Sequence, residues 1–118
     1  MSQWNLEDGL EKALEFRRAR DWEQFHRPKE LAAAIAIEAG ELQELFLWRD
    51  EESSEDIVED RTRLSRLSEE MADITIYLMF LAHDLGIDLA AAVEDKIIVN
   101  ETRYTIQDHK GVANKAQK

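Results

Sequence analysis

The hydrophobic residues of this chain recur at the three- and four-residue spacing of α-helices in four segments. The first segment covers residues 6–20 and follows Asn5, a residue type that is favoured as an N-terminal cap. The second covers residues 28–48 and starts with a proline, which the first turn of a helix tolerates. The pattern therefore predicts two helices in the N-terminal half, joined by an aromatic segment at residues 21–26.

Two further helices are expected in the C-terminal half. The third begins between residues 57 and 63 and ends at Gly86, and between residues 74 and 82 its apolar side chains surround the whole helix. A helix that is apolar on every side is buried on every side, so we expect a second subunit to cover this one. The fourth covers residues 89–103, with Asp88 as its N-terminal cap.

The sequence thus predicts an all-α fold in which four helices form a bundle, assembled as a homodimer or as a homotetramer built from two dimers. One domain is expected over residues 1–104, followed by a flexible polar C-terminal tail over residues 105–118. Residues 50–55 are acidic and are interpreted as a polar connection, with Ser54 as a candidate cap. One proline and four glycines in 118 residues leave few helix breakers, which favours long helices.

The charge of the chain limits the partners that we expect. Its formal net charge is −11 at pH 7, so a nucleic-acid polymer would be repelled. A free triphosphate would be repelled as well, so a polyanionic substrate needs cations at the binding site. The longest apolar run is shorter than the roughly 20 residues of a membrane span, and the N-terminal residues show no targeting segment. We therefore expect a cytoplasmic protein with no membrane partner.

Four carboxylates are the strongest candidates for chemistry. Glu38 and Glu41 lie three residues apart on the second expected helix, and Glu70 and Asp73 have the same spacing on the third. Residues at this spacing project side by side, so each pair can bind or bridge a hard cation such as Mg²⁺ or Mn²⁺. Glu38 also falls on an apolar face, where an unpaired carboxylate is costly. Because the chain has 26 acidic residues, solvated surface with chance spacing is the alternative.

Other residues are suited to contact a phosphate or a nucleobase. Cationic and hydrogen-bonding side chains lie on the fourth expected helix and just after it: Lys96, Asn100, Arg103 and Tyr104. Aromatic side chains that can stack on a base flank the second helix: Trp22, His26 and Trp48. Tyr77 lies four residues after Asp73 and so shares the carboxylate face. The alternative for the first group is an ordinary helix end, and for the aromatic group it is a hydrophobic contact between helices. The alternative for Tyr77 is a core tyrosine.

The order of these residues resembles the MazG-like family of all-α nucleotide pyrophosphohydrolases. The pattern Glu38-x-x-Glu41 followed by Glu70-x-x-Asp73 is similar to the acidic signature of that family. Four ordered strings within residues 6–104 resemble its dCTP pyrophosphatase branch more closely: residues 20–26, 40–48, 69–74 and the pattern from Lys96 to Tyr104.

The resemblance implies a homotetrameric enzyme that cleaves a nucleoside triphosphate, dCTP or a modified dNTP, to a monophosphate and pyrophosphate. It implies that Mg²⁺, or Mn²⁺, is held by the four carboxylates Glu38, Glu41, Glu70 and Asp73. It also implies that Lys96, Asn100 and Tyr77 contact phosphate or sugar, assisted by Arg103 and Tyr104, and that Trp22, His26 and Trp48 surround the base. Glu41 and then Glu38 are the candidates to orient the attacking water.

Two positions depart from the family pattern. Ile37 replaces the first Glu of the fuller signature, as in the dCTP branch, and Ala13 stands where vertebrate relatives carry a histidine. The second departure leaves the preference for cytosine open. The same fold acting on dUTP, an oxidised nucleotide or another nucleotide therefore stays an alternative. A non-enzymatic helical oligomer or adaptor is the other, although it does not explain acidic residues within an apolar face.

Overall fold

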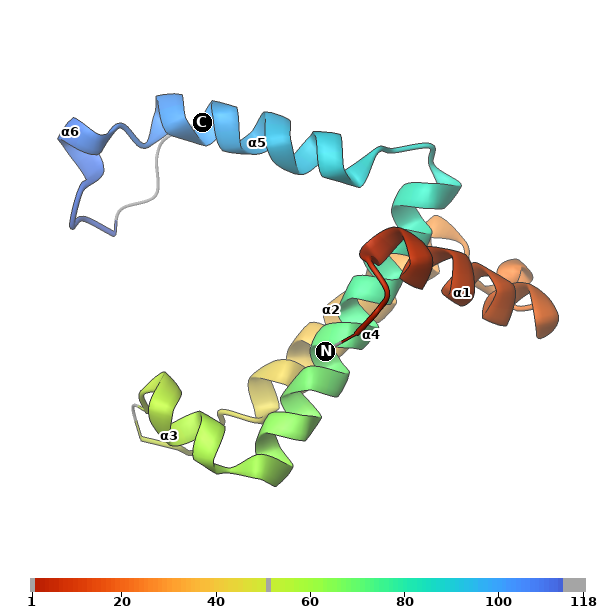
Figure 1. Ribbon diagram of the computed structural model, residues 1–118, viewed down its shortest axis with the longest axis horizontal. Helices are drawn as coiled ribbons and strands as arrows, with labels where there is room; N and C mark the ends of the chain where they lie inside the picture. Colours follow the sequence, from red (N-terminus) through yellow and green to blue (C-terminus); the bar gives the residue numbers. More distant parts are fainter. Residues whose placement is uncertain (1, 51, 114–118) are drawn as a thin grey trace. The chain divides into compact units, whose positions relative to one another are not determined.

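A computed structural model describes residues 2–50 and 52–113 of the chain, and all regular elements in these residues are helices (Figure 1). The predicted all-α class is confirmed. The elements are α1 (Leu6–Ala19), the 3₁₀ turn η1 (Glu23–Phe25), α2 (Pro28–Glu44), α3 (Ser54–Glu59), α4 (Arg61–Asp84), α5 (Leu89–Arg103) and α6 (Ile106–His109). They divide into two compact units at Gly86, whose φ of 68° is a backbone conformation that favours glycine.

The first unit is built on α2 and α4, which pack along each other (Figure 1). Arg63 bonds to Leu45 at one end of the pair, and Glu70 lies beside Glu38 about two turns away. The residue number rises on α4 as it falls on α2, so the two helices are antiparallel. Helices α1 and α3 each pack on α4. The buried hydrophobic side chains of this unit are Leu31, Leu45, Leu67, Phe80 and Ala82.

The N-terminal caps explain where the helices begin. Asn5 accepts a hydrogen bond from the Asp8 backbone N–H at 2.8 Å, and the Asp8 carboxylate accepts one from the Asn5 N–H at 3.2 Å. Asp88 caps α5, as predicted, through the Ala91 N–H at 3.0 Å. The sequence prediction of Ser54 as a cap is wrong, because Ser53 caps α3 instead.

The boundaries of the first, third and fourth predicted helices agree with the structure to within about two residues. The second ends at Glu44 rather than at residue 48, and the following residues form turns. Trp48 has a φ of 62°, which no α-helix accommodates. The short helix α3 was not expected, because the acidic residues around it have no apolar stripe long enough to reveal one turn of helix.

The second unit contains α5 and α6. Within the segment for which the sequence predicts only a tail, residues 106–109 form α6, capped by the Thr105 hydroxyl. The Tyr104 and His109 rings lie edge to face, with centroids 5.2 Å apart. The part of the predicted tail at residues 114–118 lies outside the described residues.

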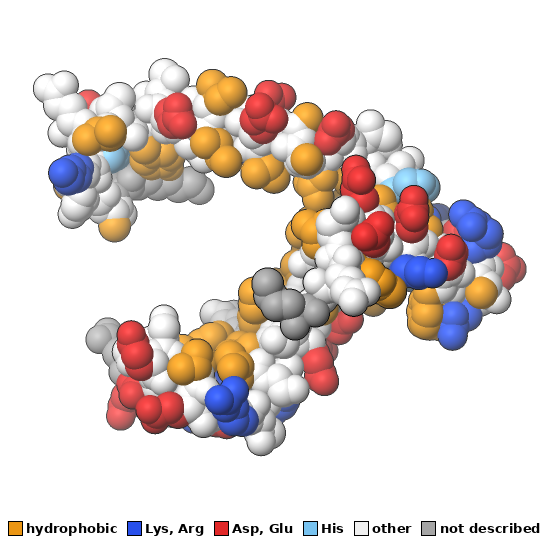
Figure 2. Space-filling model, viewed as in Figure 1, with side chains coloured by type: hydrophobic (Ala, Val, Ile, Leu, Met, Phe, Trp, Pro, Cys, Tyr) orange, Lys and Arg blue, Asp and Glu red, His pale blue; other side chains and the backbone are white. Residues whose placement is uncertain are grey.

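Large apolar side chains remain exposed in both units. Figure 2 shows hydrophobic side chains along the length of α5, where Ile97 and Ile98 are 53% and 57% exposed. Among the described residues, no single helix has both the length and the apolar character needed to span a membrane, and α4 and α5 meet that test only when taken together across the break between them.

Candidate functional site

Three carboxylates meet where α2 and α4 lie side by side. Glu38 and Glu41 come from α2 and Glu70 from α4, and one oxygen from each lies within 4.8 Å of the others. We call these three residues the acidic cluster. The spacing of three residues puts both α2 carboxylates on one face, and the antiparallel packing brings that face to Glu70.

The acidic cluster is short of positive charge. One carboxylate oxygen of Glu38 and one of Glu70 are buried, and neither has a hydrogen-bond partner among the described residues. The pKa of Glu38 is raised to about 7, first because its protonated carboxyl hydrogen-bonds to Glu70, and then by burial and by the charge of Glu41. Oxygen-only ligands with unpaired buried atoms are the donor set that a hard divalent cation needs. The residues therefore fit a metal ion.

Asp73 and Tyr77 connect the acidic cluster to a neighbouring cavity. Asp73 lies three residues after Glu70 on α4, outside the set of oxygens within 4.8 Å, and it lines the cavity together with Tyr77. The pKa of the Tyr77 hydroxyl is raised, first by burial and then by the charges of Glu38, Asp73 and Glu41. Tyr77 therefore keeps its proton at neutral pH and can donate it in a hydrogen bond.

The cavity has a volume of about 500 Å³ and lies between α1, the segment around η1 and α4. We call it the aromatic pocket, because an unbroken series of rings forms its wall. Ring centroids lie 5.5 Å apart for Phe16 and Trp22, 6.2 Å for Trp22 and His26, and 6.2 Å for His26 and Tyr77. Phe80 lies 5.4 Å from His26 behind this wall. A pocket of this kind suits a flat, apolar-faced ligand.

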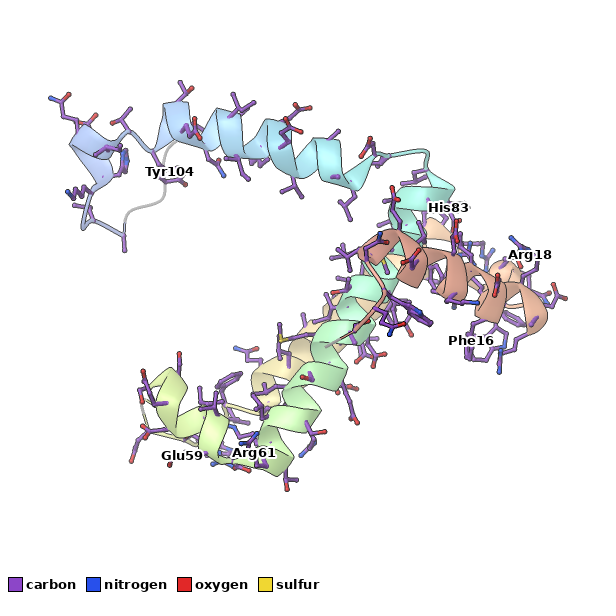
Figure 3. The ribbon with its side chains drawn as sticks, viewed as in Figure 1. Phe16, Arg18, Glu59, Arg61, His83 and Tyr104 are labelled. Carbon is purple, nitrogen blue, oxygen red and sulfur yellow. The ribbon has the colours of Figure 1, made fainter. Side chains whose placement is uncertain are left out.

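The polar groups of the aromatic pocket are few. Arg17 is buried and forms a bidentate ion pair with Asp84, with nitrogen–oxygen distances of 2.9 and 2.8 Å. The pKa of His26 is lowered, first by burial and then by the positive charge of Arg17, so the imidazole is neutral at pH 7. Ala13 of α1 also lines the pocket, as does Phe16, which Figure 3 labels.

The structure brings together seven of the residues that the sequence singled out. Glu38, Glu41 and Glu70 form the acidic cluster, and Asp73 and Tyr77 join it to the aromatic pocket, where Trp22 and His26 lie. Sequence reasoning missed the assignment of Arg17, Asp84 and Phe80 to this region. The signal for Arg17 was a charged residue on the apolar stripe of the first helix, which is unusual unless the charge is paired.

Five predicted site residues are not among those that the first unit groups around the acidic cluster and the aromatic pocket. Trp48 lies on the turn after α2, is 94% exposed and does not line the aromatic pocket. The others belong to the second unit, which is described by itself: Lys96, Asn100, Arg103 and Tyr104. Within that unit Asn100 and Arg103 are half-buried, whereas Lys96 is exposed. Their assignment to the site stays a prediction.

Comparison with known proteins gives consistent results. The sequence model of the MazG-like family matches residues 33–118. The chain is 44% identical to dCTP pyrophosphatase 1 of Bos taurus over 97% of its own length and 68% of the relative, and 44% identical to that of Homo sapiens over 84% and 58%. It thus spans about three-fifths to two-thirds of these relatives. A crystal structure of a pyrophosphatase from Archaeoglobus fulgidus superposes with a TM-score of 0.76 at 37% identity, covering 89% of this chain and 96% of the other. The chain belongs to the MazG-like family.

Proposed function

We propose that this chain is a metal-dependent nucleoside triphosphate pyrophosphohydrolase (a nucleoside triphosphate diphosphatase) that acts on dCTP or a modified dNTP. The observation that carries the proposal is the acidic cluster next to the aromatic pocket, joined by Asp73 and Tyr77. A divalent cation site and a site for a flat ring are what a metal–nucleotide complex requires. The relatives named dCTP pyrophosphatase 1 support this substrate class.

Mg²⁺, or Mn²⁺, would be held by Glu38, Glu41, Glu70 and Asp73. When bound, the cation neutralises phosphate oxygens and acidifies water. Glu41 is exposed, whereas Glu38 and Glu70 are half-buried, so Glu41 is the most accessible base of the cluster and orients the attacking water. Glu38 is the second candidate, because its carboxylate lies in the same cluster as Glu41.

The base and sugar are assigned to the aromatic pocket. Trp22 and His26 contact the base. The Tyr77 hydroxyl donates a hydrogen bond to the sugar or to a phosphate at the border with the acidic cluster. Phosphate contacts from the second unit, and a base contact from Trp48, complete the site in this proposal. Their residue types suit these roles: Lys96, Asn100, Arg103 and Tyr104.

We also infer that the chain assembles with copies of itself, as a homodimer or a homotetramer. The support is the exposure of large apolar side chains such as Met71, Leu78, Ile97 and Ile98, which water would otherwise contact. Sedimentation equilibrium at micromolar concentration tests this inference, and a monomeric mass would contradict it. A cytoplasmic location, with no nucleic-acid polymer or membrane as partner, stays a prediction from the sequence.

A panel of nucleotides tests the function. The protein is incubated with Mg²⁺ and with dCTP, 5-methyl-dCTP, dUTP, an oxidised dGTP and the other dNTPs, and both pyrophosphate and orthophosphate are measured. We expect pyrophosphate, with dCTP or its methylated form turned over fastest. Fastest turnover of dUTP or of the oxidised nucleotide would favour that alternative substrate. No product from any nucleotide would favour the adaptor, and orthophosphate as the first product would contradict the proposed cleavage position.

A further inference from the structure

A bidentate ion pair at the aromatic pocket, which Arg17 helps to line, has no role in the chemistry proposed so far. Arg17 of α1 donates from both terminal guanidinium nitrogens to the two carboxylate oxygens of Asp84, the last residue of α4. The side chain of Arg17 is 5% exposed and that of Asp84 is 25% exposed. Hydrogen bonding between them raises the pKa of Arg17 and lowers that of Asp84, so both groups are charged at neutral pH.

The pair meets the aromatic pocket at Arg17, which lines it, and contacts the pocket wall through Phe80. The central guanidinium carbon of Arg17 lies 4.4 Å from the centroid of the Phe80 ring, and that ring is 3% exposed. The His26 ring packs on Phe80 and also contacts the rings of Trp22 and Tyr77. A shift of Arg17 therefore moves the ring against which the pocket wall is packed.

A buried ion pair contributes little net stability to the contact between two helices. Burying charges costs desolvation energy, and hydrophobic residues of similar volume often stabilise a contact equally well. What a bidentate pair adds is orientation, because two parallel hydrogen bonds fix the plane of the guanidinium. The remaining nitrogen, Arg17 Nε, is buried and has no hydrogen-bond partner among the residues that the structure describes, so the Asp84 carboxylate and the Phe80 ring together set that plane.

We propose that the Arg17–Asp84 pair is a positioning element for the nucleobase of the substrate, acting through the pocket wall formed by Phe80 and His26. This inference rests on the proposed nucleotide substrate and deepens it. The pair holds α1 and α4, the two sides of the aromatic pocket, at a fixed separation and orients the aromatic wall between them. Loss of the pair weakens recognition of the base, whereas the arrangement of the carboxylates in the acidic cluster on α2 and α4 is unchanged.

The test compares Arg17→Met, Asp84→Asn and the double variant with the wild type. Arg18→Met is the matched control, because Arg18 is the next residue of α1 and is exposed (Figure 3). Two quantities are measured with Mg²⁺: KM and kcat for dCTP, and Kd for a dCTP analogue with a non-hydrolysable imido bridge between the α and β phosphates. The Kd of inorganic pyrophosphate, which has no base, is measured alongside, and circular dichroism monitors helicity.

We expect KM for dCTP and Kd for the analogue to rise about 10- to 100-fold in all three pair variants, with kcat and the Kd of pyrophosphate changed by no more than about threefold. The double variant should bind no worse than the weaker single variant, because the two residues act as one unit. Arg18→Met should match the wild type. If Arg17→Met does not fold, Arg17→Lys keeps the charge but loses the bidentate geometry, and a smaller rise in Kd is expected.

An unchanged Kd for the analogue in folded pair variants would overturn the proposal. Equal losses of affinity for the analogue and for pyrophosphate would also overturn it, because they indicate a general structural role. A wild type that binds the analogue but releases no pyrophosphate from any nucleotide would disprove the proposed function alone, and the Kd comparison would still decide the role of the pair. A wild type that binds no nucleotide would overturn both.

Discussion

The carboxyl groups of Glu38 and Glu70 belong to different helices, yet Glu70 is the largest cause of the rise in the Glu38 pKa to about 7. Each residue keeps one buried oxygen that has no hydrogen-bond partner in the described part of the chain. Two carboxyls in this arrangement cannot both ionise without cost unless a cation lies between them, and otherwise one of them stays protonated more readily. In the folded chain these carboxyls therefore bind either a proton or a cation, and this gives a prediction about the pH dependence of stability.

Without divalent cations, the pH dependence of stability should reveal the titration of the Glu38 carboxyl. The folded-state pKa of about 7 lies above the ordinary value of 4.5, so the folded state binds this proton more tightly. The stabilising contribution of the protonated form is complete below pH 4.5 and is lost as the pH rises through 7. We expect the Tm of the wild type, relative to that of Glu38→Gln, to fall between pH 5 and 8, because Glu38→Gln lacks this titration.

The comparison with Glu38→Gln is needed because the contribution of His26 to stability changes with pH in the opposite direction over part of this range. Its pKa is lowered, so its contribution to stability is lost as the pH falls below its ordinary value of 6.5. Both proteins share that contribution, so it cancels in the difference. Differential scanning fluorimetry in a chelator measures both curves, and Mg²⁺ should flatten the difference because the cation favours the ionised carboxylates. Parallel curves in the chelator would contradict the assignment of the raised pKa.

Neutral substitutions at the metal ligands should abolish turnover while leaving the fold intact. We expect Glu41→Gln, Glu70→Gln and Asp73→Asn each to lower kcat by about two orders of magnitude or more, because each removes a charge that holds the cation or orients water. Glu69→Gln is the matched control, since Glu69 adjoins Glu70 on α4 but is exposed. Pyrophosphate release and helicity are measured together. Wild-type turnover in Glu41→Gln or Asp73→Asn would end the assignment of that residue.

Arg63 should be among the most important residues for stability in the first unit. Its side chain is 4% exposed, donates from Nε to the Leu45 carbonyl at 2.8 Å and pairs with Glu52. Arg63→Met leaves that carbonyl without its hydrogen bond, so we expect a loss of about 2–3 kcal/mol in the free energy of unfolding. Urea denaturation measures the loss. Arg61→Met, at an exposed position two residues earlier (Figure 3), should change it by less than about 0.5 kcal/mol.

Trp48 should show opposite effects on stability and on nucleotide binding. Its φ of 62° is strained for a residue with a side chain, and its ring is 94% exposed. Trp48→Gly relieves that strain, so we expect an increase of about 0.5–1 kcal/mol in the free energy of unfolding. If Trp48 contacts the base as proposed, the same variant should raise KM for dCTP. Leu47→Gly, at a residue without positive φ, should instead destabilise the protein, and stabilisation by both variants would contradict the strain argument.

The exchange of one small residue tests base preference. Ala13 lines the aromatic pocket, at the position where vertebrate relatives are expected to carry a histidine. Ala13→His adds a ring with hydrogen-bonding nitrogens, so we expect kcat/KM to change differently for dCTP and dUTP. Ala13→Leu adds similar bulk without polar atoms and should lower both values together. Equal effects of the two variants on both substrates would show that position 13 does not discriminate between the bases.

Local sequence patterns were sufficient for most of the helices. Residues 61–84 and 89–103 have long apolar stripes with strong caps or a following glycine, and these signals act within a few residues, so the sequence by itself determined α4 and α5. The pairing of Glu38 with Glu41 was likewise readable, since three residues along a helix fix a shared face. The end of α2 could not be predicted from the sequence, because it depends on Arg63 of α4, which donates a hydrogen bond to the Leu45 carbonyl.

Only the tertiary structure decided how these local features meet. The antiparallel packing of α2 and α4 brings Glu70 to Glu38, and no spacing in the sequence specifies that pairing. The Arg17–Asp84 pair joins residues 67 positions apart, and the aromatic pocket combines residues of α1 and α4. Only the packing of α1 on α4 brings these residues together. The physical reason is that helix formation depends on neighbouring residues, whereas a binding site depends on which faces are buried against each other.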